Sequence, residues 1–371
     1  MTLSKEEGKV YFISGGGTGG HIYPAVTVAD ALLEESDTHK IFYIGNPDNL
    51  EFDIISKKNN ITFLPVKVKG MPRKADFGFI KWLWDLEVAT WKSLFYILKY
   101  KPDAIYTTGG YVSAPILFAA TILKRPFMIH DSDASPGLVS KLVAPCAKVV
   151  SVAFEKAKEV LNSDNIICNG NPIRTSFAKY TKEEALKELN LENKITILAM
   201  GGSQGAKSIN SAVVEIIKKF ETRDDIQIIL QTGKKNFDEV KKALDGIKNV
   251  NAIIRPYFED MAIPLKVADI VIARAGSLSL SEINLLGLPS ILVPYPYAAA
   301  NHQWKNAMEM EEKGASICLE DSKCKGESLY NIIQSLIEDS NKLQKMATSA
   351  KNLAKPDATK HIVNELKSII K

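Results

Sequence analysis

The chain has 371 residues, of which 46% are hydrophobic and 24% are charged, and its formal net charge is +4. This length suffices for two hydrophobic cores, and the composition excludes an intrinsically disordered chain. The slight basic excess suits an anionic ligand or membrane surface, although many ordinary globular proteins share it. It predicts no nucleic-acid partner.

The cysteines and the first residues bear on the compartment. None of the four cysteines forms a C-x-x-C pair, which argues against a zinc site and favours a reducing compartment. The polar segment Met1–Lys9 predicts no signal peptide, and no apolar run approaches the roughly 20 residues that span a bilayer. We expect a cytoplasmic protein without metal or cofactor, whose membrane contact is peripheral.

The first half opens with a strand, a glycine-rich turn and a helix. Lys9–Ser14 predicts a buried strand, Gly15–Gly20 a turn, and His21–Glu35 has helical periodicity. Glycines let backbone N–H groups approach an oxyanion, and the helix N-terminus adds a positive partial charge. The turn lacks the Lys-Ser/Thr of a P-loop, which disfavours a nucleoside triphosphatase, and a plain tight turn is the alternative. His21 is a candidate phosphate donor or proton acceptor.

The segment Met71–Tyr100 interleaves aromatic and basic residues and holds three of the four tryptophans. This pattern is typical of a helix lying in an anionic membrane interface, and an ordinary amphipathic helix is the alternative. We expect Trp91, Phe95 and Leu98 to be core residues. The membrane interpretation is preferred for the residues at the start of the segment, namely Phe77, Phe79, Ile80, Trp82, Leu83 and Trp84.

Two further strands are predicted before the middle of the chain. Pro102–Tyr106 is followed by Gly109-Gly110, an apolar helix and a second strand over Pro126–His130. A domain boundary is predicted near Asn171–Ser176, in the stretch that follows Asn169-Gly170. Its Arg174 is a candidate to bind a phosphate group across an interdomain cleft, and an ordinary surface arginine is the alternative.

The second half repeats this order. A strand over Lys194–Met200 leads into a second glycine turn, Gly201–Ala206, in which Ser203 is a candidate phosphate donor. Farther along, a strand over Ala268–Ala273 precedes Gly276 and a helix from about Ser279. Strands that alternate with helices predict parallel sheets. We therefore predict an α/β protein with two doubly wound, Rossmann-like domains facing a cleft, with ligands outside the carboxyl ends of the strands.

Two segments of the second half carry polar side chains suited to a nucleotide sugar. Ala273–Glu282 combines a glycine with serines at a helix start, which suits a diphosphate, and Glu282 is a candidate ligand of the ribose hydroxyls. A capping role for Glu282 is the alternative. Asn301-His302-Gln303 suits sugar hydroxyls, with a polar helix cap as the alternative. A dinucleotide oxidoreductase needs a single pyrophosphate loop, so the duplicated turns argue against one.

Taken together, these residues resemble the MurG family of bacterial glycosyltransferases, which make lipid II from lipid I in peptidoglycan synthesis. The resemblance covers nearly the whole chain. The motifs that carry it occur in order: GGGTGGHIYPA from Gly15, GGYVSAP from Gly109, GNPIR from Gly170, GGSQGA from Gly201, PYFEDM from Pro256, ARAGSLSLSE from Ala273, NHQWKNA from Asn301 and KPDAT from Lys355.

The resemblance implies a GT-B fold and an inverting transfer of N-acetylglucosamine from UDP-N-acetylglucosamine. The implied acceptor is the muramyl-pentapeptide on undecaprenyl diphosphate, met at the cytoplasmic face of the cell membrane and its anionic inner leaflet. The implied domains are residues 1–173, on the acceptor and membrane side, and residues 174–355, which bind the donor. The last helix, 356–371, is implied to pack back on the first domain.

The resemblance also implies roles for individual residues. Thr18, Gly19 and Gly20 contact the donor side of the cleft, and Arg174 and Ser203 hold the diphosphate. The remaining implied contacts are with uracil through Phe258, with diphosphate and ribose through Ser277, Leu278, Ser279, Leu280, Ser281 and Glu282, and with the sugar through His302 and Gln303.

One departure from the family concerns the acceptor. The family usually has His-Glu-Gln-Asn where this chain has His130-Asp131-Ser132-Asp133. Asp133 is a candidate general base, which an asparagine cannot be, and His21 is the other candidate. The departure keeps open a related transferase with a different lipid acceptor. A non-catalytic UDP-binding module is the alternative of another class.

Overall fold

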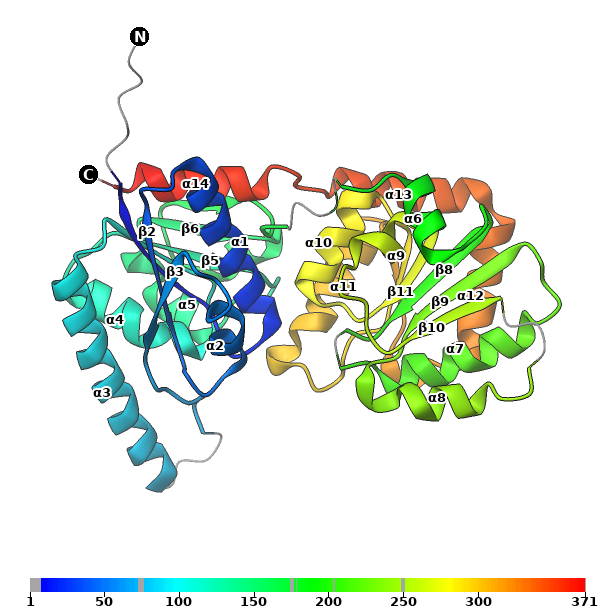
Figure 1. Ribbon diagram of the computed structural model, residues 1–371, viewed down its shortest axis with the longest axis horizontal. Coiled ribbons are helices and arrows are strands. Elements are labelled where there is room, and N and C mark those ends of the chain that lie inside the picture. The colour runs from blue at the N-terminus through cyan, green and yellow to red at the C-terminus, as the bar shows by residue number, and fades with distance from the viewer. Residues whose placement is uncertain are drawn as a thin grey trace, which may run out of the picture. The chain divides into compact units, whose positions relative to one another are not determined.

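A computed structural model of the chain describes residues 8–72, 77–173, 177, 179–202, 204–247 and 251–370. The chain divides into two compact units, residues 1–173 with 356–371, and residues 174–355 (Figure 1). Each unit contains one sheet whose paired strands all run parallel. The prediction of two doubly wound parallel sheets is confirmed.

The sheet of the first unit has the order β3-β2-β1-β4-β5-β6-β7. Its strands are β1 (Val10–Ser14), β2 (Lys40–Gly45), β3 (Ile61–Pro65), β4 (Ala104–Thr107), β5 (Phe127–Asp131), β6 (Val149–Val152) and β7 (Ile166–Cys168). Its helices are α1 (Gly19–Glu35), α2 (Leu50–Ile55), α3 (Phe77–Tyr100), α4 (Ala114–Ile122), α5 (Leu138–Val143) and α14 (Ala358–Ser368). The strands predicted over 9–14, 102–106 and 126–130 are confirmed to within two residues.

Alternate side chains of these strands enter two separate cores, because successive residues of a strand point to opposite faces. Phe12 belongs to the core that α3 and α4 cover, and Tyr11 and Ile13 belong to the core that α1 covers. The final helix, α14, inserts Ile362 and its apolar neighbours into this second core. The chain thus returns to its first unit after completing the second.

The second unit repeats the topology with the order β10-β9-β8-β11-β12-β13. Its strands are β8 (Ile195–Met200), β9 (Ile226–Gln231), β10 (Ala252–Arg255), β11 (Ile270–Ala273), β12 (Ser290–Leu292) and β13 (Ser316–Cys318). Its helices are α6 (Lys182–Leu189), α7 (Lys207–Lys219), α8 (Phe237–Ala243), α9 (Ala262–Val267), α10 (Ser277–Leu286), α11 (His302–Glu312), α12 (Gly326–Glu338) and α13 (Ser340–Asn352).

The long helix α3 corrects one sequence prediction. Trp91, Phe95 and Leu98 were expected in the core, yet their side chains are 66%, 58% and 59% exposed. The core face of α3 carries Ala89, Ser93, Tyr96 and Ile97 instead, which follow the helical repeat. This prediction was wrong because both faces of α3 are rich in apolar residues, so the helical periodicity did not identify which face is buried.

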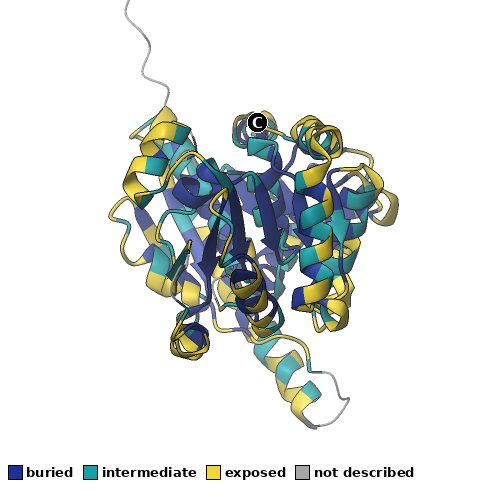
Figure 2. Cartoon of the chain, turned by 90° about the vertical axis from the view of Figure 1, so that its right-hand side faces the viewer, coloured by how far each residue is buried: buried dark blue, intermediate teal, exposed yellow. Residues whose placement is uncertain are grey.

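Exposed residues are yellow in Figure 2, and those of α3 include six large apolar side chains at helical spacing, which we call the α3 stripe. It comprises Ile80, Trp84, Val88, Trp91, Phe95 and Leu98, with exposed fractions between 51% and 66%. Among the described residues no helix, α3 included, is long and apolar enough to cross a membrane.

Candidate functional site

Both glycine turns follow the strand at which the strand order of their sheet reverses. β1 lies between β2 and β4, and β8 lies between β9 and β11. In open parallel sheets, ligands bind at the carboxyl ends of strands at this point, because the connecting loops diverge there. Each unit therefore presents one candidate site, formed at its glycine turn.

The first turn is held in place by a buried carboxylate. Glu51 is fully buried, and its two oxygens accept hydrogen bonds from the N–H groups of Gly17 (3.3 Å) and Asn46 (3.1 Å). The Tyr43 hydroxyl donates to the carbonyl of Gly15. Burial raises the pKa of Tyr43 well above its usual value, and the Glu51 charge raises it further. Sequence reasoning missed both residues, because neither lies in a glycine motif.

The glycines of this turn are required to different degrees. A Cβ on Gly15 would lie 2.0 Å from Thr108 Oγ1, and one on Gly16 would lie 2.6 Å from Glu51 Oε1. Gly17 has a φ of +85°, which side chains rarely adopt. By contrast, a Cβ on Gly20 would have its nearest neighbour at 3.7 Å. Close contacts and backbone conformation therefore explain why residues 15, 16 and 17 are glycines, whereas neither requires a glycine at position 20.

Thr18, Gly19 and Gly20 lie at the start of α1, where backbone N–H groups point out of the helix. The Thr18 carbonyl accepts from the N–H groups of His21 and Ile22, both at 3.1 Å, and its side chain makes no capping hydrogen bond. Thr18 and Gly20 are exposed. The geometry suits binding of an anion at this end of α1.

His21 lies in the same first turn of α1, near Asp131 at the end of β5. Its ring packs against Gly110, where an added Cβ would come within 3.2 Å of His21 Cδ2. Its Nδ1 is buried and has no hydrogen-bond partner within the described part of the chain. Asp131 is held by the N–H groups of Gly137 (3.1 Å) and Asp133 (3.4 Å).

Electrostatics link these groups into one cluster. Burial raises the pKa of Asp131, the nearby charge of Asp133 raises it further, and the charge of His21 lowers it. Asp131 therefore interacts with both candidate bases, His21 and Asp133. Burial of Asp131 and its backbone hydrogen bonds make it a supporting group, whereas Asp133 is partly exposed.

His130 has a structural role that the sequence did not reveal. Its ring is fully buried between Ser151 Oγ and Asn171 Oδ1, each 3.0 Å from a ring nitrogen. Burial lowers the pKa of His130 to about 4, so the ring is neutral near pH 7. Asn171 belongs to the GNPIR motif, so this contact fixes the end of the first unit.

The second glycine turn is supported by neutral amides. Gln231 donates from Nε2 to the Gly202 carbonyl (3.3 Å) and accepts at Oε1 from the Phe258 N–H (2.9 Å). Asn236 Nδ2 donates to the Gln204 carbonyl at 3.3 Å. Gly205 has a φ of +74°, and a Cβ there would lie 1.8 Å from the Thr232 carbonyl oxygen.

Gln231 connects the proposed uracil-reading residue to the turn. Because the Phe258 N–H already donates to Gln231, a base that used this N–H would have to displace the Gln231 amide. Gln231 is buried and gave no signal in the sequence, since it lies at the end of a strand outside every recognised motif.

The serine-rich segment forms the start of α10. Gly276 caps this helix, and the Ser281 hydroxyl donates to the Ser277 carbonyl at 3.0 Å. The Leu280 side chain is fully buried, so only its backbone is available to a ligand. Leu278, Ser279 and Glu282 are partly exposed.

Arg274, just before α10, clamps the surrounding loops together. Its Nη1 pairs with Asp321 Oδ1 at 2.6 Å and donates to the Val293 carbonyl at 3.0 Å. The Ser208 hydroxyl, at the start of α7, joins the same carboxylate at 2.5 Å. This clamp joins the ends of β11 and β12 to the first turn of α7.

His302 and Gln303 open α11 after a strained turn. Ala300 and Asn301 adopt φ values of +50° and +56°. His302 Nδ1 lies 2.8 Å from the Ala299 carbonyl, and Gln303 Oε1 accepts from the Tyr295 N–H at 2.9 Å. Both proposed sugar ligands are therefore tied to the loop before the helix.

Some predicted site residues lie outside the described residues: Arg174, Ser203 and the side chain of Phe77. Within the described part of the chain, no group of three or more His, Cys, Asp or Glu side chains is arranged to hold a metal ion.

Comparison with known proteins matches both halves of the chain to one family. Residues 11–152 match the glycosyltransferase family 28 N-terminal domain, and residues 196–362 match the C-terminal domain of that family. Proteins from Desulforamulus reducens and Halothermothrix orenii are each 38% identical over 96% of this chain and 98% of their own. Both are named UDP-N-acetylglucosamine--N-acetylmuramyl-(pentapeptide) pyrophosphoryl-undecaprenol N-acetylglucosamine transferase.

Solved structures agree with these relatives. The crystal structure of Acinetobacter baumannii MurG is 26% identical and covers 97% of this chain and 99% of its own, with a TM-score of 0.79. A glycosyltransferase of kitacinnamycin, at 12% identity and a TM-score of 0.73, shares the fold alone.

Proposed function

Because the chain belongs to the MurG group of glycosyltransferase family 28, we propose that it transfers N-acetylglucosamine from UDP-N-acetylglucosamine to lipid-linked muramyl-pentapeptide. The acceptor is carried on undecaprenyl diphosphate, and the product is lipid II. The observation that carries the proposal is the match of both halves of the chain to full-length relatives with this one activity.

In the proposed reaction, the first glycine turn faces the sugar that is transferred and the diphosphate of the acceptor lipid. The acceptor hydroxyl attacks the anomeric carbon of N-acetylglucosamine from the face opposite UDP, which inverts that carbon. A new carbon–oxygen bond forms, the bond to the diphosphate breaks, and the hydroxyl proton passes to His21 or Asp133. Two observations support this assignment: His21 Nδ1 is buried without a hydrogen-bond partner among the described residues, and Asp133 is partly exposed beside Asp131. General-base assistance contributes about 10²–10⁴ in rate.

The second unit is the donor side. The departing UDP gains negative charge, which the N-terminus of α10 and the side chains of Arg174 and Ser203 stabilise. Glu282 accepts the ribose hydroxyls, Phe258 contacts uracil, and Gln303 with His302 contacts the sugar. The amides of Gln231 and Asn236 support this role, because they hold the second turn without adding a negative charge beside the diphosphate.

A transfer assay tests the proposal. Labelled UDP-N-acetylglucosamine is incubated with a short-chain lipid I analogue, with a diacylglycerol acceptor and UDP-glucose in parallel. We expect transfer only from UDP-N-acetylglucosamine to the lipid I analogue. Faster transfer to diacylglycerol would show that lipid I is not the preferred acceptor. Binding of UDP without any transfer would support the non-catalytic alternative.

We further propose that the enzyme works as a peripheral protein at the cytoplasmic face of the cell membrane. The α3 stripe supports this, because exposed aromatic residues suit the membrane interface. Lys92 and Lys99 on the same helix suit anionic lipids. Trp82 is a weaker membrane contact, since it is partly buried and its Nε1 donates to the Lys69 carbonyl at 2.8 Å.

Liposome partitioning tests this second proposal. The double variant Trp84→Ser and Trp91→Ser removes two exposed rings, and we expect weaker binding to anionic liposomes with unchanged binding of UDP. Tyr297→Ser removes an 81% exposed aromatic ring from the second unit and is the matched control. Equal partitioning of the double variant, the control and the unaltered protein would exclude the α3 stripe as the membrane contact.

A further inference from the structure

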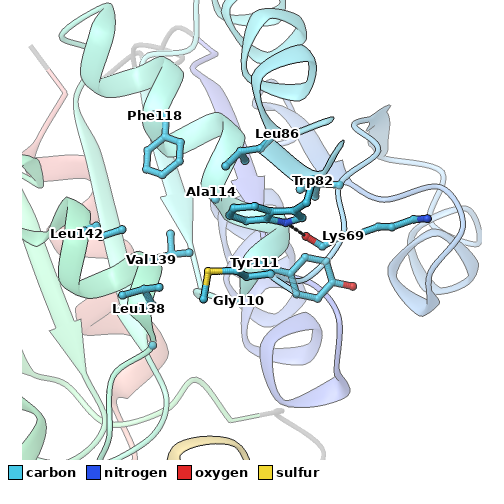
Figure 3. Close-up of a pocket in the computed structure, with 13 residues that line it drawn as sticks. Lys69, Trp82, Leu86, Gly110, Tyr111, Ala114, Phe118, Leu138, Val139 and Leu142 are labelled. Carbon is cyan, nitrogen blue, oxygen red and sulfur yellow. Dashed lines mark hydrogen bonds between the residues drawn. The ribbon is translucent and has the colours of Figure 1, made fainter. Parts of the chain in front are cut away.

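An apolar pocket of about 280 Å³ lies in the first unit between α3, α4 and α5 (Figure 3). Trp82 and Leu86 of α3 form one wall, and Leu138 and Leu142 of α5 form another. Phe118 of α4 lines it as well. None of the residues discussed so far as ligands of the nucleotide sugar lines this pocket.

The polar atoms around the pocket are engaged elsewhere. Trp82 Nε1 donates to the Lys69 carbonyl, and the Tyr111 hydroxyl accepts from Asn49 Nδ2 at 3.0 Å. Lys69 lines the pocket, but Figure 3 shows its side chain pointing away from the other lining residues. The lining of the pocket is therefore apolar, which favours an apolar ligand over a polar one.

The inner end of the pocket borders the first glycine turn. Gly110 and Tyr111 line the pocket and also contact that turn. A Cβ on Gly110 would lie 2.8 Å from the Gly16 carbonyl oxygen, and one on Gly17 would lie 2.9 Å from Tyr111 Cε1. A group bound at the turn is thus separated from the pocket by the thickness of one residue.

Exposed apolar side chains also lie at the pocket and on the neighbouring helix α3. Leu138 and Leu142, which line the pocket, are 56% and 60% exposed, and Leu83 and Trp84 of α3 are exposed as well. Trp82 and Leu86 place the pocket beside the helix that carries the α3 stripe, and Gly110 and Tyr111 place it beside the first glycine turn.

We propose that this pocket binds the first isoprenoid units of the acceptor lipid, those attached directly to its diphosphate. The inference rests on the proposed function, because it needs a diphosphate at the first glycine turn. A polyprenyl diphosphate joins an anionic group directly to an apolar chain, which matches a turn adjoining an apolar pocket. The pocket lies just below the usual range of roughly 300–1,000 Å³ for small-molecule sites. It therefore takes a short segment of the chain, and the rest continues to the membrane.

Two substitutions probe the pocket without disturbing the core. Gly137 lines the pocket, has a φ of −68°, and an added Cβ there meets nothing within 4 Å. Gly137→Leu therefore fills space without backbone strain. Leu142→Ala removes an exposed part of the wall. Ile122→Ala is the matched control, since Ile122 is 63% exposed in the same unit and does not line the pocket.

The experiment compares two soluble acceptors without membranes. Both carry the muramyl-pentapeptide diphosphate, one with a farnesyl chain and one with a butyl chain. For the unaltered protein we expect a KM at least about tenfold lower with the farnesyl acceptor, because more apolar surface is buried. Leu142→Ala should reduce this ratio about threefold, and Gly137→Leu should remove most of it. The KM for UDP-N-acetylglucosamine and the Ile122→Ala ratio should not change.

A binding measurement keeps the test independent of turnover. Calorimetry should show that farnesyl diphosphate binds more tightly than inorganic diphosphate, and Gly137→Leu should weaken the binding of farnesyl diphosphate about tenfold. The proposal is overturned if the ratio of the KM values for the butyl and farnesyl acceptors is the same in all variants. A change in liposome partitioning alone would not rescue the proposal, because it would show only that the pocket residues face the membrane. A different outcome is that no transfer occurs, yet the protein binds farnesyl diphosphate and Gly137→Leu weakens this binding. That outcome would count against the proposed function and would support the pocket as a binding site.

Discussion

The two glycine turns occupy the same position in two sheets of the same strand order, yet different side chains support them. Glu51, a buried carboxylate, holds the first turn, and the His21, Asp131 and Asp133 cluster surrounds it. The side-chain amides of Gln231 and Asn236 hold the second turn. Topology thus gives both turns the same place in their sheets, whereas the side chains around them differ in charge. The titratable groups beside the first turn suit proton transfer, and the amides hold the second turn without adding charge.

The largest expected effect concerns the candidate bases at the first turn. We expect His21→Ala or Asp133→Asn to lower kcat by about 10²–10⁴, whichever residue accepts the proton. Steady-state kinetics with both substrates saturating measures this, and thermal unfolding checks that each variant folds. If neither variant loses at least about tenfold in kcat, both assignments are wrong and proton transfer does not distinguish the two turns.

The buried ring of His130 predicts how stability near the first turn depends on pH. Burial lowers its pKa from 6.5 to about 4 in the folded protein, so between these values the unfolded chain binds a proton that the folded chain does not. The free energy of unfolding should therefore fall as the pH drops from 6.5 towards 4, by up to about 3 kcal/mol. Asp131, whose pKa is raised from 3.8, opposes part of this loss.

Urea unfolding at several pH values measures the effect, followed by the fluorescence of Trp82, Trp84 and Trp91, which all lie in the first unit. His130→Gln removes the titrating ring. We expect a weaker pH dependence in this variant, and the same dependence in both proteins would show that His130 is not the group responsible.

A charge placed behind the second turn should abolish the contrast between the turns. Gln231→Glu retains an acceptor for the Phe258 N–H but loses the donor to the Gly202 carbonyl and adds a negative charge. We expect the KM for UDP-N-acetylglucosamine to rise about tenfold, through repulsion of the diphosphate. Gln231→Met is the uncharged control. An equal rise in both variants would assign the effect to the lost hydrogen bonds rather than to charge.

The smallest expected effect on stability concerns Gly20. Since an added Cβ meets nothing closer than 3.7 Å, Gly20→Ala should change the free energy of unfolding by less than about 1 kcal/mol. It should nevertheless raise the acceptor KM if Gly20 contacts the substrate. Gly16→Ala is the contrasting variant, because its Cβ would meet Glu51 and destabilise the fold. An unchanged acceptor KM in Gly20→Ala would remove Gly20 from the proposed site.

Local strand, turn and helix signals sufficed to predict the main strands, the glycine turns and the parallel topology. Recognisable motifs also marked His21 and Asp133 as candidate bases, and these two roles stay predictions. The sequence could not determine which face of α3 is buried, since both faces are apolar, and Trp91 and its neighbours were wrongly assigned to the core.

The side chains that support each turn come from distant parts of the chain. Glu51 reaches Gly17 across 34 positions of sequence, and Gln231 meets Phe258 across 27. The apolar pocket likewise joins segments from Val68 to Leu142. Such contacts depend on how strands are ordered in the sheet and how helices rotate against it. No pattern within a short window records these relations, so the supports of both turns and the pocket beside the first could be recognised only in the folded chain.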